Sequence, residues 1–177
     1  MTCIVGVVDN NDVWIGGDSA SSDGWNIFIR SDEKVFRNGP ALFGFTSSFR
    51  MGQLLRYSLK FPDRGRQGVD RFMSTTFVDS VRECLKDGGF QSTENGVDEG
   101  GVFLVGYAGR LFEIQSDYQV AVVRNGIYAI GCGAQYAFGA LYVLPSISPK
   151  DRIKKALSAA SFYSKGVSPP FKIKKAP

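Results

Sequence analysis

The stretch Thr2-Cys3-Ile4-Val5-Gly6-Val7-Val8, with its continuation Val13-Trp14-Ile15-Gly16-Gly17-Asp18-Ser19, decides the fold. Both runs are short and rich in β-branched residues, and the Asp and Asn residues at 9–12 accept positive φ at a turn. We therefore expect an antiparallel hairpin over residues 2–17. The two glycines inside the second strand predict a bend or the close approach of another backbone. The next residue, Asp18, would then emerge near the start of the first strand.

The second residue is the candidate nucleophile. Thr2 becomes the chain terminus if Met1 is removed, and threonine is small enough for that removal to be expected. A terminal threonine carries a hydroxyl and a free amine that can accept its proton. The chain contains no histidine, which excludes Ser-His-Asp and Cys-His mechanisms, so a hydrolase needs another base. The competing interpretation of Thr2 is a strand residue behind a retained Met1.

Composition limits the class of protein. At 177 residues, without a Pro/Gly/Ser-rich linker, the chain predicts a single domain over residues 1–177. No apolar run is long enough to cross a bilayer, and the start has no basic segment followed by an apolar one. We therefore expect a cytoplasmic protein without a membrane partner.

The cysteines and the charges exclude further classes. Cys3, Cys84 and Cys132 are widely spaced, which predicts reduced thiols, no metal site and no cofactor. The formal net charge is +4, with basic clusters at residues 150–155 and 172–175. Neither cluster is interleaved with aromatic residues, so both are interpreted as solvated faces, and no nucleic-acid partner is expected.

Hydrophobic periodicity predicts the remaining elements. In chain order, the expected strands are 26–30, 34–37, 41–45, 101–106, 110–114, 119–123, 127–130 and 171–174, and the expected helices are 51–59, 69–84, 133–144 and 149–164. Residues 19–24 are expected to form a turn, and residues 26–30 and 34–37 are expected to pair as strands. Residues 91–100 are expected to be a loop, and residues 101–130 a meander whose last turn, Asn125-Gly126, is a hairpin signal.

This order is strands, two helices, strands, two helices and a closing strand. Strands joined by short turns suit antiparallel sheets, and the helices fall into two separate pairs. The simplest architecture is α+β: two antiparallel sheets packed on each other, each covered on its outer face by one pair of helices. The expected fold is thus a four-layer α-β-β-α sandwich.

With these segments in place, the chain resembles the proteasome β-subunit family of N-terminal nucleophile hydrolases, and especially the bacterial proteasome-like ATP-dependent peptidase. The likeness runs through nearly the whole chain. The matching segments are the Thr-x-Ile-Val-x-Val start, the Val-x-Ile-Gly-Gly-Asp strand, Lys34-Val35, Gly44-Phe45 and Tyr128-Ala129-Ile130-Gly131-Cys132-Gly133-Ala134-Gln135-Tyr136-Ala137. The family's α-β-β-α sandwich agrees with the order of elements derived above.

The resemblance implies a catalytic set. The Thr2 hydroxyl would attack a peptide carbonyl while its own amine, acting through water, serves as the base; an α-amine has an intrinsic pKa of about 7.7–8.0. Lys34 matches the family lysine whose charge keeps the amine neutral and the hydroxyl acidic. Asp18 matches the carboxylate that orients and offsets this lysine.

At other positions the chain departs from the family pattern. Ser47 stands where a glycine commonly supplies the oxyanion-binding N–H, and a serine can do the same if its φ and ψ allow it. Cys132 replaces a serine near the threonine amine. Ser164 and Ser168 are the nearest candidates for the family's further polar residues after the last helix. Phe45 matches the position that lines the pocket for the residue before the scissile bond, which suggests a preference for small side chains there.

Three classes of function remain open. The first is a threonine peptidase that cuts peptide or protein substrates inside homo-oligomeric rings. The second is a catalytically silent ring or scaffold subunit, which a retained Met1 would favour. The third is an N-terminal nucleophile amidohydrolase that acts on a small amide. The chain has no Gly-x-x-x-x-Gly-Lys phosphate loop, so any unfolding of substrates would require a separate ATPase.

Overall fold

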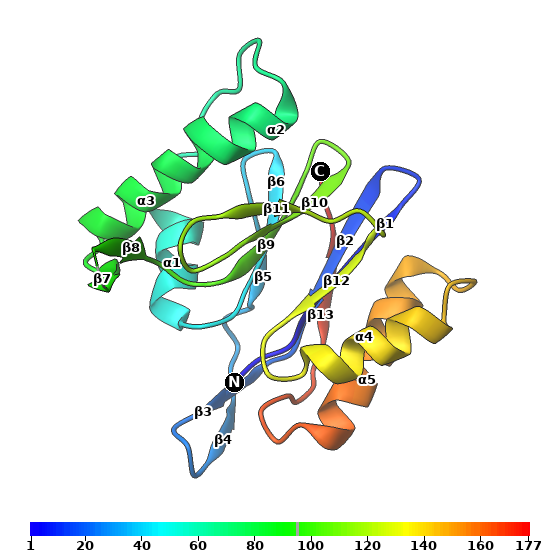
Figure 1. Cartoon of the computed structure of the whole chain (residues 1–177). Coiled ribbons are helices and arrows are strands. Elements are labelled where there is room, and N and C mark those ends of the chain that lie inside the picture. Colours follow the sequence, from blue (N-terminus) through cyan, green and yellow to red (C-terminus); the bar gives the residue numbers. More distant parts are fainter. Residues whose placement is uncertain (95) are drawn as a thin grey trace.

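The computed structural model describes residues 1–94 and 96–177. Its strands form two main antiparallel sheets (Figure 1). The four-stranded sheet has the order β12 (Ile127–Ile130), β1 (Ile4–Asp9), β2 (Asp12–Gly17), β13 (Lys172–Lys175). The five-stranded sheet has the order β11 (Val120–Val122), β10 (Arg110–Ile114), β9 (Phe103–Tyr107), β6 (Ala41–Phe45), β5 (Val35–Asn38).

Helices cover the outer faces of both sheets. The helices are α1 (Phe49–Tyr57), α2 (Val69–Phe72), α3 (Val78–Asp87), α4 (Ala134–Val143) and α5 (Pro149–Tyr163), and the π-helical turn η1 (Met73–Phe77) joins α2 to α3. Figure 1 shows α1 and α3 on one side of the molecule, with α4 and α5 on the other. The order of layers is therefore α-β-β-α, as the sequence predicted.

Three apolar clusters occupy the spaces between these layers. The cluster between the two sheets includes Ile4, Ile15 and Leu104. A second cluster, rich in phenylalanine, packs α1 and α3 against the five-stranded sheet, and a third packs α4 and α5 against the four-stranded sheet. Each sheet is thus buried on both faces, which explains why β6 reads as a continuous apolar run rather than an alternating one.

The first hairpin forms as expected. β1 pairs with β2 in antiparallel register, Val5 lying opposite Gly16. Asn10 and Asn11 both have positive φ, at 48° and 67°, in the tight turn between them. This hairpin is central in its sheet, and β2 ends one residue before Asp18.

Two of the expected strand pairings are wrong. Residues 26–30 do not pair with 34–37: β4 (Ile27–Ile29) pairs with β3 (Ala20–Ser22), which lies in a stretch expected to be a turn, and β5 pairs with β6. The meander is also interrupted, because β12 pairs with β1 in the other sheet. The Gly126 carbonyl accepts a hydrogen bond from the Val8 N–H, so the predicted hairpin turn is instead a crossing between sheets.

Two local predictions also need correction. The stretch 91–100 is not simply a loop, because it contains the short hairpin of β7 (Ser92–Glu94) and β8 (Val97–Glu99); Asn95 lies outside the described residues. These strands are polar, so no apolar alternation revealed them. The helix whose apolar positions span residues 69–84, and which Gly88-Gly89 was expected to end, does run to residue 87, but it includes the π-helical turn η1, which the spacing of apolar residues does not reveal.

In the part of the chain that the structure describes, no helix combines the length and the apolar character that a bilayer crossing requires.

The close approach of the two sheets depends on Gly44 of β6. A Cβ at this position would lie 2.6 Å from a methyl of Ile4 and 2.7 Å from a methyl of Ile15, both across the interface between the sheets. We predict that Gly44→Val lowers the free energy of unfolding by about 1–3 kcal/mol through overpacking. Denaturant unfolding would measure the loss.

The matched control is Gly139→Ala in α4. A Cβ at Gly139 meets no heavy atom within 4 Å, so this change should be neutral or raise the free energy of unfolding by up to about 1 kcal/mol. Equal midpoints for Gly44→Val and the wild type would contradict this account of the sheet interface.

Candidate active site

Asp18 forms the centre of the site. One carboxylate oxygen, Oδ1, accepts hydrogen bonds from Lys34 Nζ at 2.8 Å and from the Cys3 backbone N–H at 3.0 Å. The other, Oδ2, accepts from the backbone N–H groups of Ala20 at 2.9 Å and Ser168 at 3.4 Å. The side chain thereby ties the start of β1 to β3, to the residue before β5 and to the segment after α5.

Lys34 is buried with Asp18. Their exposed fractions are 2% and 1%, so the ion pair is shielded from water. Burial lowers the pKa of the Lys34 ammonium, and the Asp18 carboxylate acts in the opposite direction. Lys34 Nζ and the Cys3 N–H share the acceptor Oδ1. The charge of Lys34 is therefore held close to Cys3, the residue that follows Thr2.

Thr2 is held by the turn between β12 and α4. Its N–H donates to the Cys132 Sγ at 3.3 Å, and its carbonyl accepts from the Gly133 N–H at 3.4 Å. Gly131 has φ +93°, and a side chain there would collide with the Thr2 carbonyl, so this close approach requires glycine. The predicted neighbourhood of Thr2 and Cys132 is therefore present in the structure.

The segment after α5 completes the surroundings of Cys132. The Ser164 Oγ lies 3.4 Å from the Cys132 Sγ, so this hydroxyl extends the hydrogen-bonded chain that starts at the Thr2 N–H. Ser168 contributes its backbone instead: its N–H reaches Asp18, and its carbonyl accepts from the Ser19 N–H at 2.9 Å. The resemblance offered both serines only as the nearest candidates, and the fold shows that they make different contacts: Ser164 through its side chain and Ser168 through its backbone.

Met1 still precedes Thr2 in this chain. The Thr2 hydroxyl donates a short hydrogen bond to the Met1 carbonyl, and the Met1 side chain lies against Gly166. Thr2 is itself buried, whereas Met1 is half-exposed. Of the two residues, Met1 is thus the more accessible to solvent.

Ser47 has the backbone conformation that its position requires. Its φ is +67°, in the left-handed region that usually favours glycine, and its Oγ anchors the turn by accepting from the Val102 N–H at 3.1 Å. Within residues 1–94 and 96–177, the Ser47 N–H itself donates to no protein acceptor. Ser47 and Thr2 line the same hollow, whose volume is about 100 Å³.

Two aromatic side chains form one wall of this hollow. Phe45 and Phe49 pack edge to face with ring centroids 5.6 Å apart, and both also line a second cavity of about 90 Å³. Phe45 is pressed against Gly52, where a Cβ would collide with its ring. The Arg30 guanidinium lies 3.9 Å from the Phe49 ring centroid. Phe45 therefore stands between the two cavities, where sequence comparison placed the substrate pocket.

Sequence reasoning missed the other walls of the hollow. Ser21, Ser22 and Ser48 also line it, and Ser48 caps the N-terminus of α1 by accepting from the Arg50 N–H at 3.1 Å. The two serines of β3 were assigned to a turn, so their place beside Thr2 follows only from the hairpin that contains them.

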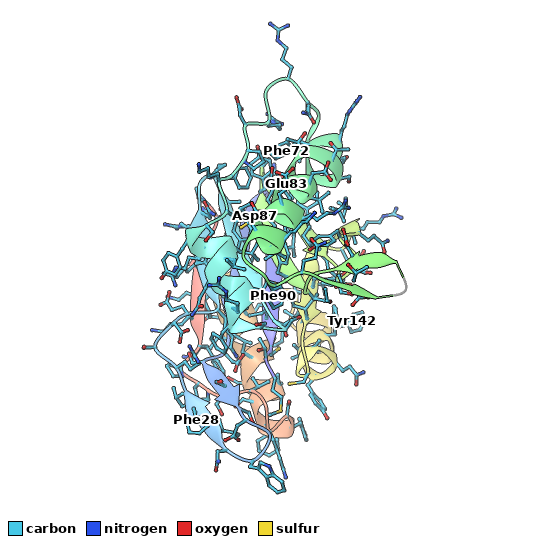
Figure 2. All side chains as sticks on the ribbon, turned by 90° about the vertical axis from the view of Figure 1, so that its left-hand side faces the viewer. Phe28, Phe72, Glu83, Asp87, Phe90 and Tyr142 are labelled. Carbon is cyan, nitrogen blue, oxygen red and sulfur yellow. The ribbon has the colours of Figure 1, made fainter. Side chains whose placement is uncertain are left out.

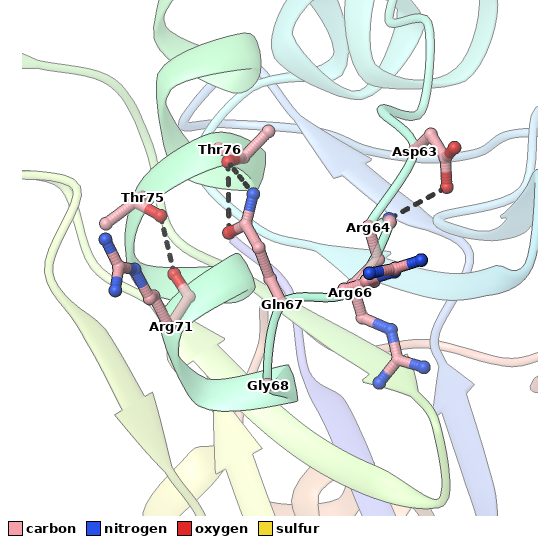
Figure 3. A pocket seen from close by; sticks show the side chains of 9 residues that line it. Asp63, Arg64, Arg66, Gln67, Gly68, Arg71, Thr75 and Thr76 are labelled. Carbon is pink, nitrogen blue, oxygen red and sulfur yellow. Dashed lines mark hydrogen bonds between the residues drawn. The ribbon is translucent and has the colours of Figure 1, made fainter.

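A larger hollow lies elsewhere in the molecule. It has a volume of about 710 Å³, and residues 63–68 with the start of the α2–α3 helix surround it (Figure 3). Gln67 and Thr76 bond to each other there at 3.0 Å, while Figure 3 shows Arg71 pointing away from Arg64 and Arg66. No residue of the predicted catalytic set contributes to it. Among the described residues, no group of His, Cys, Asp and Glu side chains is arranged to hold a metal ion.

Comparison with known proteins supports the same fold. No protein-family model matches the chain, and no curated protein matches it in sequence. Among solved structures, Thiobacillus denitrificans BPH has a TM-score of 0.81 at 19% identity, covering 98% of this chain and 96% of that one; a second structure of BPH is a complex with epoxomicin. HslV from Trypanosoma brucei has a TM-score of 0.69 at 19% identity, covering 98% of each chain. Anbu from Yersinia bercovieri has a TM-score of 0.67 at 16% identity, covering 99% of this chain and 81% of that one.

These structural neighbours are proteasome-like proteins with the N-terminal nucleophile hydrolase fold. The resemblance noted in the sequence is thus confirmed at the level of the fold.

The Asp18–Lys34 pair allows a test of the site's architecture. We predict that Asp18→Asn lowers the free energy of unfolding by about 3–5 kcal/mol, because it leaves the Lys34 ammonium buried without a counter-charge. The matched control is Asp32→Asn, which breaks the exposed pair with Arg30 and should cost about 1 kcal/mol or less. Denaturant unfolding at neutral pH would measure both, and equal losses for the two variants would refute the assignment of Asp18 as the buried anchor.

Proposed function

We propose that this chain is a threonine peptidase whose nucleophile is Thr2, exposed by removal of Met1, and which works in a ring of identical copies. The observation that carries the proposal is one arrangement: the Thr2 N–H bonds to Cys132, and Thr2 lines a hollow that is also lined by Ser47, whose N–H has no acceptor among the described residues. A nucleophile, its own base and an oxyanion donor would then face one space. The fold shared with proteasome-like neighbours supports this assignment.

The chemistry follows from these positions. With Met1 removed, the Thr2 Oγ attacks a peptide carbonyl, and its proton passes through water to the Thr2 amine. The Ser47 N–H would stabilise the negative charge that develops on the carbonyl oxygen. The protonated amine then gives its proton to the leaving amine, and water hydrolyses the ester left on Thr2, which restores the hydroxyl.

Lys34 and Cys132 would tune the amine. The positive charge of Lys34 disfavours a second positive charge nearby, which keeps the amine neutral and ready to act as base. A thiol is a weak hydrogen-bond acceptor, so Cys132 would orient the amine without strongly stabilising its protonated form. The neighbouring Ser164 hydroxyl can bond to the same sulfur.

The second candidate, a catalytically silent ring subunit, applies if Met1 is retained. While Met1 remains, the Thr2 nitrogen is a peptide nitrogen without basicity, and the Thr2 hydroxyl is bonded to the Met1 carbonyl. Such a chain would keep the fold and the Asp18–Lys34 pair but would not hydrolyse peptides. Whether Met1 is removed therefore decides between the two functions.

The test combines intact mass with peptide hydrolysis. We predict that the purified natural-sequence protein lacks Met1, hydrolyses fluorogenic peptides and gains the mass of epoxomicin, the compound found in complex with BPH. Thr2→Ala should lower the rate on the order of 10³-fold or more, since it removes the nucleophile. Thr75→Ala, a change of the same type at an exposed helical threonine, is the control and should leave the rate unchanged.

A retained Met1 without hydrolysis would establish the silent subunit instead. Hydrolysis that survives in Thr2→Ala would contradict the assignment of the nucleophile.

Phe45 should restrict the side chain that precedes the scissile bond. Because it separates two cavities of about 100 and 90 Å³, Phe45→Ala should join them and admit larger side chains. We predict that the kcat/KM ratio of large to small side chains at this position rises by about 10–200-fold. A peptide panel varied at this residue would measure it, with Phe162→Ala, an exposed aromatic that lines neither cavity, as the control. An unchanged ratio in Phe45→Ala would show that this ring does not limit the pocket.

A further inference from the structure

The β3–β4 hairpin, residues 20–29 and hereafter the arm, extends from the sheets into solvent (Figure 1). The Trp25 side chain at its tip is 95% exposed, and Ile27, Phe28 and Ile29 are each about half-exposed. A two-stranded hairpin is marginally stable in water unless it packs against something. Contiguous exposed apolar side chains of this kind indicate a surface that another molecule covers.

A complementary hollow lies between β11, β12 and α4. This groove has a volume of about 550 Å³, and its walls include Val122, Ile127, Phe138 and Tyr142. A Cβ at Gly139, in the same wall, would meet open space. The groove therefore has room for apolar side chains that this chain does not place there.

The arm cannot fill the groove of its own chain. Figure 1 shows the arm and α4 in different parts of the molecule, and Figure 2, turned by 90°, shows Phe28 at the lower end with Tyr142 higher up and on the opposite side. The occupant must come from another molecule.

Charge indicates that this molecule is a second copy. Residues 20–29 carry one ionisable side chain, Asp23 beside Trp25 at the tip. Among the described residues that line the groove, Arg124 is the one with a formal charge. An apolar hairpin with one negative charge thus matches an apolar groove with one positive charge.

We propose that the arm of one copy seats in the groove of the next, with Trp25 among the apolar walls and Asp23 facing Arg124. Arm and groove are different surfaces, so the contact is head to tail, and its repetition closes a ring if the rotation allows it. The inference rests on the proposed ring peptidase for its link to catalysis. Ser21 and Ser22 belong to the arm and line the Thr2 hollow, so a neighbour that holds the arm also holds one wall of the site.

The first experiment blocks the groove. Gly139→Trp adds a bulky ring to a wall of the groove, at a position where a Cβ meets no heavy atom within 4 Å, whereas Gly139→Ala, the matched control, leaves the groove open. Sedimentation velocity on the full chain should give a multiple of 19.3 kDa for the wild type and Gly139→Ala, and a smaller species for Gly139→Trp. Trp25→Ser, which alters only an exposed side chain, should reduce the assembly in the same way.

A monomeric wild type, or Gly139→Trp and Trp25→Ser proteins of undiminished mass, would overturn the proposal. The readout is mass, so a catalytically silent protein that assembles through these surfaces would refute the proposed function and leave this inference standing. If the protein hydrolyses peptides and neither Gly139→Trp nor Trp25→Ser changes the mass of the assembly, the proposed function would stand and this inference would be refuted.

The second experiment exchanges the charges. Asp23→Arg and Arg124→Asp should each shift the assembly toward smaller species, because each places two like charges together. The double variant should restore the wild-type mass. Double and single variants that are equally dissociated would contradict the pairing of these two residues.

Discussion

The buried ion pair of Asp18 and Lys34 is the constraint on which the site depends. Two charges removed from water are costly, and the cost is offset only where the remaining lone pairs are filled. Asp18 meets this condition by accepting from Lys34 and from three backbone N–H groups, which belong to Cys3, Ala20 and Ser168. These donors come from four different segments of the chain. The hydrogen bonds to this one carboxylate therefore fix the position of the residues next to Thr2 relative to the other three segments.

Local signals predicted much of this arrangement, and their failures have a common cause. The turn asparagines and β-branched runs of β1 and β2 are features of neighbouring residues, and they correctly placed Asp18 near the first strand. The pairing of β12 with β1 could not be predicted from neighbouring residues, because these strands are far apart in sequence and the chain crosses from one sheet to the other between β11 and β12. Asn125-Gly126 indicated a turn but not which strand the chain would meet next. The partnership of Cys132 with Ser164 is similarly a product of the fold.

Two departures from the family pattern prove compatible with the geometry. Left-handed φ costs a serine on the order of 1–3 kcal/mol relative to an unstrained residue, yet Ser47 adopts it and its hydroxyl bonds to the Val102 N–H. The side chain that adds strain therefore also anchors the turn. Cys132 occupies the place of a serine and still receives the Thr2 N–H.

The size of the hollow bears on the choice between a chain-cutting enzyme and one that recognises a small amide. Pockets that bury small molecules usually enclose about 300–1,000 Å³, whereas the space beside Thr2 is about 100 Å³ while Met1 forms one of its walls. Such a site can hold a scissile bond and one modest side chain, so it offers little selectivity of its own. Selectivity would then have to come from controlled access, which an assembled chamber supplies and a free monomer does not. The exposed arm beside Thr2 would link the site to the assembly, because the same short hairpin would form one wall of the site and make the contact between copies.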